Sequence, residues 1–346
     1  RLRRCGVPFD RSALMKRYKK LTPHGTRDLL FDECRRLRRL SAQLAALFES
    51  RGYSEVVTPL LEYYDVFDSE SVGMLPETLY KLTDSGGRLL VLRPDMTTPI
   101  ARLAATRLKD APLPLRLFYT QRVYRVSPFL GGKSDEITQS GIELIGASGP
   151  LADLEAVTLA AQALTVSGFD RFRLELGHAG IFKALVSGLD CADDLKEDIR
   201  GFVESKNFAA LGEVLDALPR CDATGLLREL PRLFGGVEAF ELVSGLRNLA
   251  GQSKGLADSA LIQLQNLYES LCGRGLKDHL SFDLGMVHRN HYYTGTVFRG
   301  YIENSGEAVL SGGRYDNLLA EFGASRPATG FALNLDAVCA AGCARS

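Results

Sequence analysis

Polar side chains fall within a segment whose pattern otherwise predicts a buried strand. Gln139 and Glu143 are four positions apart, so the two-residue period of a strand places both side chains on one face of a sheet. Gly141 lies between them in the same row and is expected to leave open space above the sheet. A carboxyl and an amide on one face could form a small polar pocket. A strand surface that faces solvent would show the same spacing.

Three further polar residues, Asp95, Thr97 and Arg125, also fall on or beside segments that otherwise read as core strands. Asp95 and Thr97 follow the apolar run 89–92, and Arg125 comes near the end of the alternating run 115–126. A carboxyl, a hydroxyl and a guanidinium at the ends of strands are groups that can bind a polar ligand.

A second group of candidates comes late in the chain, in segments 288–298 and 310–319. In a strand, Tyr292 and Tyr293 would point to opposite faces, so only one of them is expected to enter a pocket. Gly312-Gly313, directly before Arg314, would let a ligand approach the backbone closely, or would form a turn. Tyr292 and Arg314 are therefore possible residues of the pocket rim.

Composition excludes several classes of protein. Forty-two Lys and Arg balance forty-two Asp and Glu, so no long-range field attracts nucleic acid or an anionic membrane. No stretch reaches the roughly 20 apolar residues of a membrane helix. Seven scattered cysteines without a CxxC pair predict reduced thiols in a cytoplasmic protein. His288 and His291 have no third ligand beside them, so we expect no metal site.

The periodicity predicts strands on both sides of a long helical stretch. Residues 1–14 precede Met15 and are interpreted as an upstream extension or a cloning remnant. Residues 179–276 show almost no strand signal and are expected to form an inserted helical subdomain between the core segments 15–178 and 277–346. This pattern predicts an α+β fold built around an antiparallel sheet. Expected helices are 28–50, 97–108 and 151–166, and expected strands are 55–58, 89–92, 115–126, 136–145, 171–176, 281–284, 292–303, 308–310 and 330–335.

The chain contains no nucleophile elbow GxSxG, no P-loop and no dinucleotide-binding GxGxxG, so no cofactor is expected. Seven segments taken together nevertheless resemble the catalytic core of histidyl-tRNA synthetase, a class II synthetase fold. They are TPHGTRDLLFDE (22–33), LRPDMTTPIAR (92–102), FYTQRVYR (118–125), TQSGIELIG (138–146), YYTGTVF (292–298), SGGRYDNL (311–318) and GFALNL (330–335). The pattern is most similar to the synthetase-like paralogues that act as regulatory subunits of ATP phosphoribosyltransferase.

Departures from the synthetase pattern argue against adenylation. The synthetase surrounds the α-phosphate with three arginines, because charge builds there in the transition state. Here only Arg125 remains, while His288 and Ala337 stand at the other two positions and Ser127 replaces a glutamate. Losing two cations should raise the barrier by roughly 3 kcal/mol each. Because of these losses, we expect no adenylation. The sequence also shows no counterpart of the family's anticodon-binding domain, so we expect no tRNA charging.

The amino-acid pocket of the family is better preserved. By resemblance, Asp95, Thr97 and Gln139 lie at the α-amino group, Arg125 near the carboxylate, and Glu143 and Tyr293 at the imidazole of histidine. Asp95 stands where the synthetase usually has glutamate. The alternative is a relic pocket that binds nothing.

The resemblance implies a non-catalytic subunit for the first step of histidine biosynthesis. It would activate a short catalytic subunit, joining it in a hetero-octamer, and could mediate feedback inhibition by L-histidine. The homodimer would form through the first long helix and the strand at 55–59. Two alternatives stay open: an amino-acid-activating enzyme that makes an adenylate without charging tRNA, and a pseudo-synthetase that serves another partner such as RNA.

Overall fold

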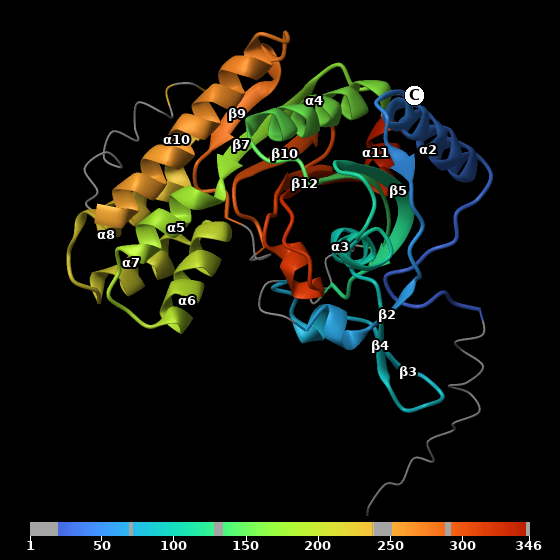
Figure 1. Cartoon of the computed structure of the whole chain (residues 1–346), viewed down its shortest axis with the longest axis horizontal. Coiled ribbons are helices and arrows are strands. Elements are labelled where there is room, and N and C mark those ends of the chain that lie inside the picture. Colours follow the sequence, from blue (N-terminus) through green and yellow to red (C-terminus); the bar gives the residue numbers. More distant parts are fainter. Residues whose placement is uncertain are drawn as a thin grey trace, which may run out of the picture.

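A mixed sheet of nine strands forms the centre of the protein (Figure 1). The structure, a computed structural model, describes residues 20–68, 72–127, 134–236, 238, 251–287 and 292–343. The strand order in the sheet is β1-β5-β6-β12-β11-β10-β7-β9-β8. The six strands from β5 to β7 in this order pair antiparallel with their neighbours in that group, whereas the pairs β1–β5 and β7–β9 are parallel. The bounds are β1 Ser54–Glu55, β5 Leu115–Tyr124, β6 Glu136–Ile145, β7 Phe172–His178, β8 Phe234–Gly235, β9 Leu280–Asp283, β10 Thr296–Ile302, β11 Leu310–Arg314 and β12 Ala328–Asn334.

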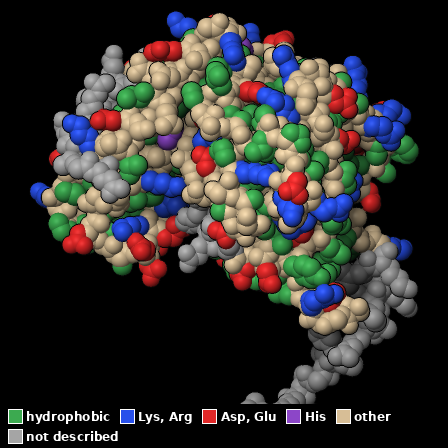
Figure 2. Space-filling view, viewed as in Figure 1, with side chains coloured by type: hydrophobic (Ala, Val, Ile, Leu, Met, Phe, Trp, Pro, Cys, Tyr) green, Lys and Arg blue, Asp and Glu red, His purple; other side chains and the backbone are tan. Residues whose placement is uncertain are grey.

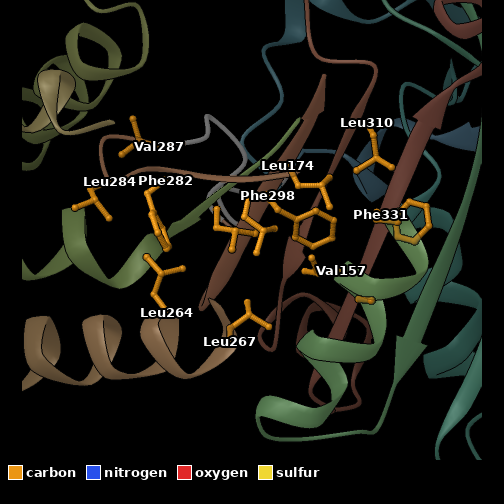
Figure 3. Packing of buried hydrophobic residues seen from close by; sticks show 14 of the residues in the cluster. Val157, Leu174, Leu264, Leu267, Phe282, Leu284, Val287, Phe298, Leu310 and Phe331 are labelled. Atoms are coloured by element: carbon orange, nitrogen blue, oxygen red, sulfur yellow. The ribbon is translucent and has the colours of Figure 1, made fainter. Parts of the chain in front are cut away.

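Long helices cover one face of this sheet. They are α2 (Asp32–Ser50), α4 (Pro150–Val166) and α10 (Gly251–Cys272), and α11 (Leu335–Cys343) packs on α2 at the end of the chain. Figure 3 shows Leu264 and Leu267 of α10 and Val157 of α4 pointing toward the strand residues Phe282, Phe298 and Phe331. Burial of this large apolar cluster is the main force that holds the helices on the sheet.

The opposite face of the sheet carries a smaller apolar cluster and the polar candidates. Alternation along β5 places Phe118 in the large cluster and its neighbours Leu117 and Tyr119 in the smaller one. Helix α3 (Thr97–Thr106) and the three-stranded sheet β2-β4-β3 lie on this side, as Figure 1 shows. The bounds of that sheet are β2 Leu61–Tyr63, β3 Lys81–Thr83 and β4 Leu89–Leu92.

The segment between β7 and β9 is mostly helical, as its pattern predicts. It contains α5 (Ala179–Ser187), α6 (Asp193–Glu204), α7 (Phe208–Asp216), α8 (Asp222–Glu229), the short strand β8 and α10. Its apolar side chains join the same cluster as the sheet, and α10 packs on α4 and β7. The helical segment and the sheet therefore share one continuous hydrophobic core.

The α+β prediction is confirmed, with several differences in the elements. The first helix begins at Asp32 instead of 28, because Phe31 adopts φ 41°, a conformation that an α-helix cannot continue. Asp32 and Glu33 then place acidic side chains at the N-terminus, where the helix dipole favours them. Strands β2, β3 and β8 are only two or three residues long and were not predicted. None of the described helices is long and apolar enough to cross a membrane.

Candidate functional site

A cavity of about 200 Å³ lies on the α3 side of the sheet. It brings together the six residues that the sequence proposed as a histidine-like pocket, although they come from four different parts of the chain. Tyr292 lines it as well. The cavity is lined by Asp95, Met96, Thr97, Arg125, Gln139, Glu143, Glu204, Tyr292, Tyr293, Ser311, Gly312, Gly313, Tyr315, Gly330, Phe331 and Ala332.

Glu143, on β6, is 1% exposed. Thr97 Oγ1 donates a hydrogen bond of 2.8 Å to its Oε1, and the hydroxyl of Tyr315 donates to its Oε2. Burial raises the pKa of Glu143 from 4.5 to about 8, although both hydrogen bonds act in the opposite direction. The carboxyl is therefore fixed in place and is ready to interact with a ligand that brings an N–H donor or a positive charge.

Asp95 is held at the N-terminus of α3. Its Oδ1 accepts a 2.8 Å bond from the backbone N–H of Thr98, and its Oδ2 accepts from Thr98 Oγ1 at 3.3 Å. Burial raises the pKa of Asp95, while the nearby charge of Arg125 works against that rise. The residue thus both ends the turn before the helix and presents a carboxyl to the cavity.

Arg125 follows directly after β5. Its Nε donates to the carbonyl of Pro94 at 2.6 Å, and its backbone N–H donates to the carbonyl of Asp135. The first bond holds the guanidinium near Asp95 and the second anchors the backbone, and Arg125 is the one arginine or lysine among the described residues that line the cavity. A guanidinium in this position can pair with a carboxylate of the ligand.

Tyr292 and Tyr293 both line the cavity, so the prediction that only one of them could enter it was wrong. The prediction assumed a strand from 292, whereas β10 begins only at Thr296 and the alternation of a strand does not apply to the tyrosines. Their ring centroids are 4.8 Å apart. The pKa of Tyr293 is raised, first by burial and then by the charge of Glu143.

The glycines at the site bring backbone and side chains close together. Gly312 and Gly313 lie within β11, so the alternative of a turn is wrong. A Cβ on Gly313 would meet the ring of Tyr293 at 2.8 Å. The open space expected over Gly141 is filled, because a Cβ there would meet the hydroxyl of Tyr119 at 2.8 Å and the carbonyl of Phe331 at 2.0 Å.

Arg314 does not line the cavity. Its guanidinium is buried in ion pairs with Asp153 of α4 at 2.8 Å and Asp316 at 3.1 Å, and it donates to the carbonyl of Gly149 at 3.0 Å. Adjacent residues of a strand point to opposite faces, which directs Arg314 toward α4 and its neighbours toward the cavity. Its role here is to join α4 to β11.

Two residues of the lining, Glu204 and Tyr315, were not predicted from the sequence, nor was Tyr119, which lies beneath the site. Glu204 belongs to the helical segment, far from the motifs in the sequence. Tyr315 follows Arg314 and could have been found from its place in the same motif. Tyr119 is fully buried opposite Gly141 in the β5–β6 register, and its hydroxyl has no hydrogen-bond partner among the described residues.

The two positions that replace synthetase arginines are not part of the described site. His288, like His291, lies outside the described residues. Ala337 is on α11, beside α2, and does not line the cavity. The described lining therefore offers three carboxyls, Asp95, Glu143 and Glu204, and one guanidinium. This set suits a small zwitterion with an additional N–H donor or positive charge better than it suits a phosphate group.

Comparisons with known proteins identify the family of this chain. The family model for histidyl-tRNA synthetase matches residues 25–338. An ATP phosphoribosyltransferase regulatory subunit of Clostridium kluyveri is 44% identical over 327 residues, 94% of this chain and 82% of that protein.

Solved structures show the same relationship. An ATP phosphoribosyltransferase regulatory subunit/histidyl-tRNA synthetase from Bacillus halodurans has a TM-score of 0.83 and 36% identity, covering 93% of this chain and 83% of that one. A histidine–tRNA ligase subunit from Alicyclobacillus acidocaldarius has a TM-score of 0.81 and 30% identity, covering 94% and 98%. The predicted class II synthetase-like fold is confirmed. The chain belongs to the histidyl-tRNA synthetase family and, within it, to the non-catalytic regulatory subunits of ATP phosphoribosyltransferase.

Proposed function

We propose that this protein activates a short catalytic subunit of ATP phosphoribosyltransferase in the cytoplasm and senses L-histidine in the cavity beside α3. The observation that carries the sensing role is the chemistry of the lining. Glu143 is a buried carboxyl held by two hydroxyls, and Arg125 is a fixed guanidinium near Asp95.

Each part of histidine has a complementary group in this cavity. The α-carboxylate pairs with Arg125, and the α-ammonium with Asp95, with Thr97 and Gln139 close by. The imidazole N–H donates to Glu143 and the ring lies against Tyr293. A cavity that is rich in carboxyls and has one guanidinium favours an amino acid with a basic side chain over a neutral one.

Regulation follows if the catalytic assembly has two states and histidine binds this subunit more tightly in one of them. The ligand then shifts the equilibrium by no more than the difference between its binding free energies for the two states. Histidine would lower activity by favouring the state in which the catalytic subunit is less active.

An exposed apolar surface supports the proposed homodimer. Figure 2 shows hydrophobic side chains gathered over the β2-β4-β3 sheet, on a face where basic and acidic side chains are otherwise interspersed. Exposed apolar patches of this kind mark protein interfaces. The exposed large apolar residues on and beside this sheet and β1 are Val57, Leu60, Leu61, Tyr63, Leu82 and Leu89. The sequence predicted a homodimer interface at the first long helix and residues 55–59, and of these Val57 belongs to this exposed surface. We propose that two copies pair through this surface together with that helix, and that the dimer joins catalytic subunits in a hetero-octamer.

Isothermal titration calorimetry with L-histidine, histamine and L-alanine tests the sensing role. Histidine should bind with 1:1 stoichiometry per chain, and histamine and alanine should bind at least tenfold more weakly, because each lacks one of the recognised groups. Equal affinity for histidine and alanine would contradict an imidazole site at Glu143.

A further inference from the structure

The helical segment contributes one ionisable side chain to the cavity. Glu204 is the last residue of α6, whereas Asp95, Arg125 and Glu143 come from the strands and turns of the core. The side chain of Glu204 is 32% exposed, in contrast to the buried Glu143, so it lies toward the opening. A ligand in the cavity would therefore touch both the sheet and α6.

Glu204 is paired in a way that leaves it free to change partner. Its Oε2 accepts from Nη1 of the buried Arg200 at 2.8 Å. Glu197 accepts three further bonds from Nε and Nη2 of Arg200, at 2.6 to 2.9 Å. Because Glu197 alone can balance the charge of Arg200, Glu204 can turn to a ligand without leaving a buried cation unpaired.

A second cavity, of about 240 Å³, separates α6 from the sheet. Its lining is mixed, because α6 contributes the charged residues Asp193, Lys196, Glu197 and Arg200. Helix α5 contributes Phe182, Val186 and the charged Lys183, and Met286, Tyr293 and Val297 lie on the core side. Tyr293 lines both cavities. Because side chains do not fill this space, α6 can move into it toward the core side.

We propose that Glu204 binds the positively charged part of the amino-acid ligand and thereby draws α6 toward the sheet, into the second cavity. This inference rests on the proposed histidine site, and it adds that helix α6 moves when the site is occupied. The ligand supplies a cation that Glu204 shares with the core carboxyls, and the space between the charged side chains of α6 and the apolar side chains of the core narrows as α6 moves in. Occupancy of the cavity thus changes the position of a helix on the surface of the protein, where a partner subunit can detect it.

The test combines histidine calorimetry with hydrogen exchange of α6 in the full-length protein. In the wild type, histidine should slow exchange of the amides of 193–204. Glu204→Gln should bind histidine about tenfold more weakly and lose this protection at saturating histidine, with an unchanged melting temperature. Glu213→Gln, which removes an exposed carboxyl from the neighbouring helix α7, should behave as the wild type.

A second variant tests the movement separately from the contact. Val186→Phe adds a ring to the second cavity and leaves all residues of the first unchanged, so it should bind histidine without protecting α6. Wild-type affinity and α6 protection in Glu204→Gln would overturn the inference, and wild-type α6 protection in Val186→Phe would overturn the proposed movement. Histidine binding that lacks α6 protection in the wild type would overturn this inference alone, whereas no binding by the wild type would overturn the proposed histidine site as well.

Discussion

Glu143 and Gly330 face each other across β6 and β12, and the carboxyl lies where a side chain of residue 330 would be. The two residues are direct partners in the register, and a Cβ on Gly330 would stand 2.0 Å from Oε2 of Glu143 and 2.3 Å from the carbonyl of Ile142. The glycine is what allows the buried carboxyl to lie flat along the sheet and reach Tyr315 and Thr97.

Gly330→Ala should therefore disturb the cavity directly. The added methyl group cannot fit without moving Glu143 or the strand, which should lower the free energy of unfolding by about 1–3 kcal/mol and weaken histidine binding. Chemical denaturation and calorimetry measure both effects. Gly225→Ala is the matched control, because its Cβ meets nothing within 4 Å in α8, and it should stabilise the protein by about 0.5–1 kcal/mol. A Gly330→Ala variant as stable as the wild type would contradict this packing.

Stability should fall as the pH rises through the range in which Glu143 titrates. The pKa of about 8 in the folded protein exceeds the usual 4.5, so the folded state keeps a proton that the unfolded chain releases. The free energy of unfolding therefore decreases, through this group, from about pH 4.5 to about pH 8 and then levels off. The glutamine of Glu143→Gln cannot titrate. In urea denaturation, the free energy of unfolding of this variant should therefore decrease less between pH 5.5 and 8 than that of the wild type. Parallel pH profiles for both proteins would show that Glu143 titrates normally.

Arg125→Gln should separate recognition of the carboxylate from that of the imidazole. Loss of the guanidinium should weaken histidine binding at least tenfold, because charge-assisted hydrogen bonds contribute about 1.5–3 kcal/mol. Histamine has no carboxylate, so its affinity should change far less. Arg122→Gln is the control, since Arg122 is half exposed and pairs with Glu136 instead. An equal loss of affinity for histidine and for histamine would show that Arg125 does not bind the carboxylate.

The sequence predicted the strands at the site better than the shape of the cavity. Long alternating runs located β5 and β6 closely, and the four-residue spacing of Gln139 and Glu143 correctly placed them together. It could not show that Tyr292 and Tyr293 precede the strand, because two aromatic residues before a strand have the same local pattern as a strand start.

Long-range contacts account for the other differences. The space over Gly141 is taken by Tyr119 from the paired strand, and Glu204 reaches the cavity from a position 58 residues after the nearest core motif, 138–146. Arg314 is withdrawn from the cavity by Asp153, a partner 161 positions earlier. Partners of this kind depend on the packing of α4 and α6 on the sheet, which no local pattern encodes.

Val57→Glu tests the proposed homodimer surface. Val57 is 77% exposed beside β1, and a carboxylate that the proposed interface buries there would be unpaired and costly. The variant should be monomeric by analytical ultracentrifugation. It should still unfold in one cooperative thermal transition, which shows that the chain is folded. Leu151→Glu is the control, because Leu151 is 75% exposed on α4, away from the β2-β4-β3 sheet, and it should leave the dimer intact. If the Val57→Glu variant remains dimeric, the interface lies elsewhere.

The formation of phosphoribosyl-ATP by a short catalytic subunit, with and without this protein and across a histidine titration, tests the central claim most directly. We predict that the catalytic subunit gains activity when this protein is added, that histidine reverses the gain, and that Glu143→Gln reduces the reversal. Catalytic activity that does not change on addition of this protein would contradict the account.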